Sequence, residues 1–109
     1  MTERAAYTFF ADLTAEAVAP RRGIHSQTLS DVDGVELVLF AMAQGERLSE
    51  HTAARPAIVH VLSGSGELVV AGDRHALTVG AWLRMAAGTP HAITATSDLV
   101  FALYLLKRE

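Results

Sequence analysis

The chain has 109 residues, a formal net charge of −3 and no cysteine. This length allows one domain with a buried core, and the lack of cysteine excludes disulfides and thiolate zinc sites. The scattered basic residues form no face for nucleic acid, and no apolar run approaches the roughly 20 residues that a membrane helix needs. The first ten residues lack the apolar stretch of a secretory signal, so we expect a cytoplasmic protein.

One short helix is expected near the N-terminus, followed by strands. Apolar residues lie at helical spacing over residues 12–18, and Pro20 ends that pattern. A strand is expected over residues 23–29. After Gly34, short apolar segments alternate with turn signals, and Gly72–Asp73 is of the kind that joins hairpin strands. The pattern predicts further strands, as in a sandwich or barrel, over residues 35–43, 57–62, 67–71, 75–79, 81–85, 91–95 and 99–107.

Two turns each place a histidine beside a strand. Gly88 tolerates a positive φ and Pro90 has a restricted φ, so the turn they form aims the next side chain, His91. Upstream, Gly45 precedes His51 at a strand edge in a similar way. Two histidines on neighbouring strands are one way to build a metal site in a β-barrel. The pair is therefore a candidate site, and the alternative is that both residues only line a pocket and make hydrogen bonds.

Strands 57–62 and 99–106 are apolar on both faces, whereas a sheet with one solvated face should alternate. One face is expected to fill the interior with Val59, Val61, Phe101, Leu103 and Leu105. The other face is expected to need cover over Ile58, Leu62, Leu99, Tyr104 and Leu106. A second subunit is the predicted cover, which makes the protein a homodimer. The alternative cover is the first 30 residues of the same chain.

The two glycine–histidine segments resemble the motifs of the cupin superfamily, and the resemblance spans residues 23–106. In the second motif, over residues 80–95, the matching positions are Gly80, Gly88 and His91, with Ala86 in place of proline. In the first motif, over residues 45–64, they are Gly45, His51 and Gly64, with Ala53 at the second histidine and Ala57 at the glutamate. The resemblance to small single-domain bacterial cupins implies one all-β domain over residues 1–109. Its expected fold is a jelly-roll barrel (a double-stranded β-helix) with a short N-terminal helix.

The resemblance also implies a family metal site of three histidines and a glutamate, of which only His51 and His91 are present. Such a pair would hold a divalent transition metal (zinc, nickel, iron or manganese) weakly, because stable sites use three or four protein ligands. Strand alternation is expected to direct Glu50 and His60 away from the interior, unless a bulge reverses it. Nothing in the sequence brings His25 to the pair.

Two functions follow as alternatives. The first is a small-molecule-binding barrel with His51 and His91 as its polar contacts and with an apolar cavity lined by Val59, Val61, Met85, Ile93 and Phe101. Arg55, in the loop after His51, would either bind a carboxylate or phosphate of the ligand or be solvated. The second function is a metal-dependent oxygenase or isomerase with a reduced ligand set. Acid–base catalysis by the two histidines is a narrower third option.

Other polar residues receive plainer interpretations. His60 is expected at an interface and His75, beside a hairpin turn, in solvent. Trp82 is expected in the core. Ser49 has no group assigned to orient a base, so a catalytic triad is unsupported.

Overall fold

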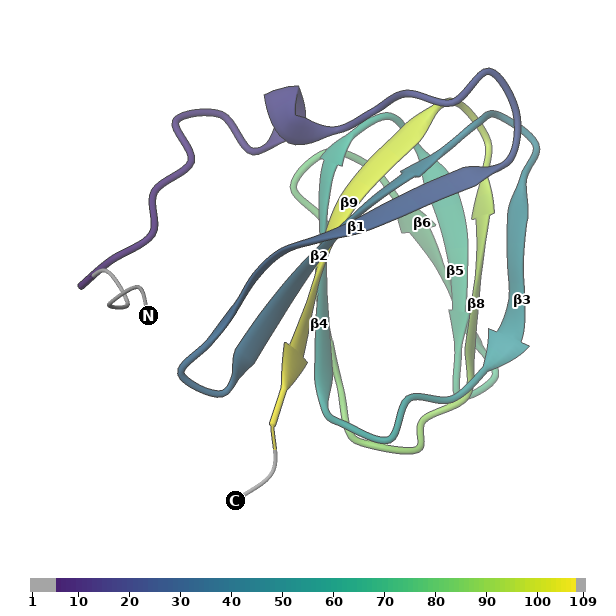
Figure 1. Ribbon diagram of the computed structural model, residues 1–109. Coiled ribbons are helices and arrows are strands. Elements are labelled where there is room, and N and C mark those ends of the chain that lie inside the picture. The colour runs from purple at the N-terminus through teal and green to yellow at the C-terminus, as the bar shows by residue number, and fades with distance from the viewer. Residues whose placement is uncertain (1–5, 108–109) are drawn as a thin grey trace.

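The structure is a computed structural model that describes residues 6–107. Residues 1–5, part of the stretch compared above with a secretory signal, lie outside this range. The described residues are mostly β-structure, so the expected all-β class is confirmed (Figure 1). The strands are β1 (Ile24–Val32), β2 (Val35–Met42), β3 (Arg47–His51), β4 (Ala57–Ser63), β5 (Gly66–Val70), β6 (Asp73–Leu77), β7 (Trp82–Met85), β8 (His91–Ala95) and β9 (Leu99–Leu106).

The expected N-terminal helix is only a single 3-10 turn, η1 (Thr14–Glu16). The Asp12 carboxylate accepts a hydrogen bond from the Thr14 N–H at 3.1 Å, and Ala17 is already extended, with ψ at 139°. An Asx-type bond of this kind satisfies the backbone without a longer helix. Within the described residues, no helix is long and apolar enough to span a membrane.

The strands form two antiparallel sheets that face each other across the core (Figure 1). The first sheet has the order β1-β2-β9-β4-β7 and the second has the order β3-β8-β5-β6. Strands β6 and β7 are therefore the last strands of different sheets and do not pair with each other. The expected barrel is open along this side.

Strand alternation explains most of the core. In β4 and β9, Val59, Val61 and Phe101 point inward and are at most 2% exposed. Leu99 was expected on the outer face, but it is also buried. It is two residues from Phe101 along β9, so the two side chains share the inward face, and Leu99 lies opposite Met42. The remaining residues expected to need cover are half-buried: Ile58, Leu62, Tyr104 and Leu106.

Two expectations about single elements were wrong. Trp82 is 61% exposed, because it lies opposite His60 on the outer face of the first sheet. The strand expected over residues 75–79 is β6, which starts earlier, at Asp73. The reason is that the hairpin turn is formed by the positive-φ residues Ala71 and Gly72, and not by Gly72 and Asp73.

Within the described residues, one side-chain hydrogen bond joins the N-terminal segment to the first sheet. Gln27 Nε2 in β1 donates a hydrogen bond to the carbonyl oxygen of Glu16 at 2.6 Å. Earlier in the segment, Tyr7 and Phe9 are 80% and 74% exposed. Phe10 is half-buried, so the segment leaves Tyr7 and Phe9 uncovered but not all of its aromatic side chains.

Candidate functional site

A β-bulge brings the two candidate histidines together. His51 ends β3 and His91 begins β8, and the two are paired residues in the antiparallel ladder. The register shifts by one residue between Leu48 and His51. Without this shift, His51 would lie on the opposite face from Leu48, which packs against the core. The bulge therefore turns His51 to the face that carries His91, and Glu50 is left exposed.

The two imidazole rings lie side by side at one end of the barrel. Their centroids are 4.2 Å apart, with an interplanar angle of 56°. His91 is only 6% exposed and is the one buried polar residue among residues 6–107. His51, in contrast, is exposed. One ring is thus fixed in the interior and the other borders solvent.

Backbone carbonyls set the same tautomer in both rings. His51 Nδ1 lies 2.8 Å from the carbonyl oxygen of Ser49, and His91 Nδ1 lies 2.9 Å from that of Thr89. A carbonyl oxygen only accepts, so each Nδ1 carries a hydrogen. In the neutral form each Nε2 atom then has a free lone pair. Metal-binding histidines are oriented by the same kind of hydrogen bond.

The space next to the pair is small. A cavity of about 20 Å³ is lined by Phe40, Leu48, His51, Val59, His91, Ile93, Phe101 and Leu103. This volume holds roughly one water molecule. The rings of Phe40 and Phe101 are stacked at 4.9 Å between centroids and fill the interior. The apolar cavity expected here is therefore small, and Val61 and Met85 are not among its lining residues.

Sequence reasoning missed Phe40, although it did place Val59, Ile93 and Phe101 correctly in this lining. The signal was available in part, because Phe40 lies two residues from Val38 and from Met42 along β2 and so shares their face. The pairing of Phe40 with Phe101 across β2 and β9 depends on strand register, which no local pattern reports.

Arg55 is paired within the chain. Its guanidinium forms a salt bridge with Glu36, and the two side chains are 26% and 22% exposed. Glu36 also accepts a hydrogen bond from the hydroxyl of Thr28 at 3.1 Å. Arg55 is therefore not an isolated solvated arginine, and a ligand carboxylate would compete with Glu36 for its guanidinium.

The residues at the other motif positions supply no ligand side chain. Ala57 is 2% exposed and lies opposite Met85, and the Ala53 carbonyl accepts a hydrogen bond from the Gly88 N–H at 2.8 Å. His60 lies opposite Trp82 on the outer face, and His25 lies opposite Ala41 in β2. Within residues 6–107, no three histidine, cysteine or acidic side chains gather as a metal would require. The donor set therefore does not fit a stable metal centre.

Comparison with known proteins identifies relatives of this fold. The profile of the cupin domain family matches residues 38–106. A conserved protein of unknown function from Streptococcus pyogenes has a TM-score of 0.81 and 26% identity, covering 98% of this chain and 92% of its own. A cupin 2 conserved barrel domain protein from Leptotrichia buccalis has a TM-score of 0.79 and 27% identity, covering 87% and 46%.

A more distant structure is salicylate 1,2-dioxygenase from Pseudoaminobacter salicylatoxidans, with a TM-score of 0.72 and 17% identity. It covers 82% of this chain and 26% of its own. This likeness concerns the fold alone. No curated protein sequence gave a significant match.

Proposed function

Because this chain belongs to the cupin domain family, we propose that it binds a small molecule at the end of the barrel where His51 and His91 lie. The observation that carries the proposal is the matched pair of Nδ1–H···O=C hydrogen bonds, which leaves Nε2 of each neutral ring free to accept, with the ring centroids 4.2 Å apart. Among the described residues, no buried side-chain nitrogen lacks a hydrogen-bond partner, so water reaches these Nε2 atoms. A ligand hydroxyl would replace this water as the hydrogen-bond donor.

The chemistry of the pair indicates the class of ligand. Neutral Nε2 atoms accept hydrogen bonds, so the ligand should present a donor such as a hydroxyl group. The surrounding side chains are apolar, and the space of about 20 Å³ between them admits little more than that hydroxyl. The rest of the ligand would cover the opening beside the exposed ring of His51. A phenol fits this description better than a sugar phosphate.

The test uses phenol and its methyl ether, anisole, which has the same ring but no donor. Chemical shifts of the labelled protein are followed during titration with each compound. We expect phenol to shift the His51 and His91 ring signals and to bind at least fivefold more tightly than anisole. His91→Phe should abolish the preference, and His25→Phe, on the outer face, should keep it. Equal binding of the two compounds would refute the proposal.

The second candidate function is a metal-dependent oxygenase or isomerase. The observation that favours it is the carbonyl-oriented pair of imidazoles, since metal ligands are commonly oriented in this way. Against it, a two-histidine set holds zinc, nickel, iron or manganese weakly. Elemental analysis after incubation with each metal distinguishes the candidates. Stoichiometric metal that is lost in His51→Ala would favour this second function over the first.

A further inference from the structure

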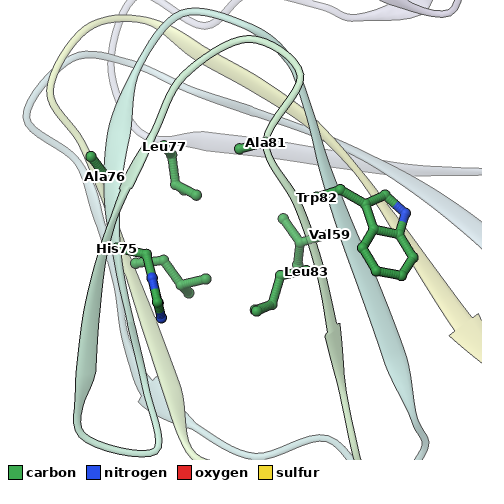
Figure 2. A pocket seen from close by; sticks show the side chains of 8 residues that line it. Val59, His75, Ala76, Leu77, Ala81, Trp82 and Leu83 are labelled. Carbon is green, nitrogen blue, oxygen red and sulfur yellow. The ribbon is translucent and has the colours of Figure 1, made fainter.

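A second and larger cavity opens on the side of the molecule where the two sheets do not meet. Its volume is about 300 Å³, and it lies between the last strands of the two sheets, β6 and β7 (Figure 2). The lining residues are Val59, Leu68, His75, Ala76, Leu77, Ala81, Trp82 and Leu83. We call this space the lateral cleft. It shares only Val59 with the small cavity beside His51 and His91.

The walls of the lateral cleft are apolar side chains of the core. Leu77 projects from β6 toward Leu83 on β7, and Val59 lies behind them (Figure 2). Leu68 and Val59 are at most 2% exposed, so the cleft reaches the centre of the core. The ring of Trp82 lies on the far side of β7 from His75, and it borders the cleft without filling it (Figure 2).

One polar side chain enters the cleft. His75 lies opposite Leu68 in the β5–β6 pair, so it shares the inward face of the sheet even though it sits on an exposed edge strand. It is the single ionisable side chain among the described lining residues. Its neighbour Arg74 is paired with Glu67, and Asp73 is exposed and outside the lining. The edges of β6 and β7 add backbone N–H groups that none of the nine described strands uses.

We propose that the lateral cleft binds a flat apolar molecule of about two fused rings that carries one hydrogen-bond acceptor, such as a carboxylate. The size follows from the volume, because an apolar cavity of roughly 150 Å³ accommodates benzene and this one has about twice that space. The ligand should carry an acceptor because the polar groups of the cleft are donors: the imidazole N–H of His75 and the backbone N–H groups of the strand edges. The site is independent of the one proposed at His51 and His91.

The experiment is a titration of the labelled full-length chain with 2-naphthoate, followed by amide chemical shifts. We expect the shifts to gather at Leu77, Ala81 and Leu83, and to leave His51 and His91 unmoved. Benzoate carries the same carboxylate on one ring and should bind at least tenfold more weakly, because it leaves half of the apolar space unfilled. Shifts confined to the His51–His91 end would overturn the proposal.

Variants separate the roles of volume and acceptor. Ala81→Leu fills the cleft and should weaken 2-naphthoate binding at least tenfold, while Ala15→Leu, on the exposed turn η1, should change nothing. His75→Leu keeps the bulk but removes the donor, and we expect a loss of several fold. If Ala81→Leu does not fold, His75→Trp adds bulk to the cleft from the exposed strand β6 while it retains an N–H donor. Unchanged affinity in a folded cleft-filling variant would contradict the assignment.

Discussion

Gly64, the last glycine of the first cupin motif, offers a sharp test of the fold. It has a φ of +81°, and a Cβ atom built on it would lie 1.8 Å from the carbonyl oxygen of Asp98. Gly72, in the β5–β6 turn, has a φ of +85° with nothing within 4 Å of such a Cβ. The two positions share the backbone conformation and differ in the close contact.

The expected losses follow from this difference. At either position, the left-handed backbone conformation of an alanine destabilises the folded state by about 1–2 kcal/mol. At position 64, the backbone around Asp98 must also move, which costs about a further 1–3 kcal/mol, as other overpacking changes do. We therefore expect Gly64→Ala to lower the free energy of unfolding by about 2–5 kcal/mol and Gly72→Ala by about 1–2 kcal/mol.

Urea denaturation of both variants measures the two losses, provided that the m-value stays constant. The reasoning requires a larger loss at position 64. Equal losses would mean that the contact with Asp98 is relieved at no cost, and the explanation of this motif glycine by close backbone approach would be refuted.

Three further predictions concern the core, the missing ligands and the outer face. Phe101→Ala should cost about 3–5 kcal/mol of unfolding free energy in the same assay, because the ring is 1% exposed and stacks on Phe40. Ala53→His combined with Ala57→Glu should raise zinc affinity at least 100-fold in a competition titration, since it completes a four-ligand set; unchanged affinity would show that these positions do not face the histidines. The chain should sediment as a homodimer, and Tyr104→Asp, on the half-buried outer face, should yield a folded monomer; a monomeric parent protein would exclude the interface.

Much of the architecture was readable from local patterns. The short apolar runs separated by glycine-rich turns predict an all-β protein, and Val59 and Val61, which share one face of residues 57–62, are interior as expected. The turn at Gly88–Pro90 predicts a directed His91, which the structure places as a buried, hydrogen-bonded residue. Each of these properties depends on residues within about one turn or strand of one another.

The site depended on contacts that no local pattern encodes. Strand β3 has Leu48 as its one apolar residue, so its pairing with β8 gives little sequence signal, and the bulge that turns His51 inward exists only within that pairing. The stacking of Phe40 on Phe101 likewise follows from the register of β2 on β9, and it reduces the expected cavity to about 20 Å³.

The sequence by itself therefore determined the strand class, the inward position of Val59 and Val61 and the two candidate histidines, because these depend on neighbours along the chain. Only the tertiary structure decided how much space lies beside those histidines and where the sheets part to leave the lateral cleft between β6 and β7. Those properties arise from the relative placement of strands that are distant in sequence, and side-chain packing between such strands is decided by register and not by local alternation.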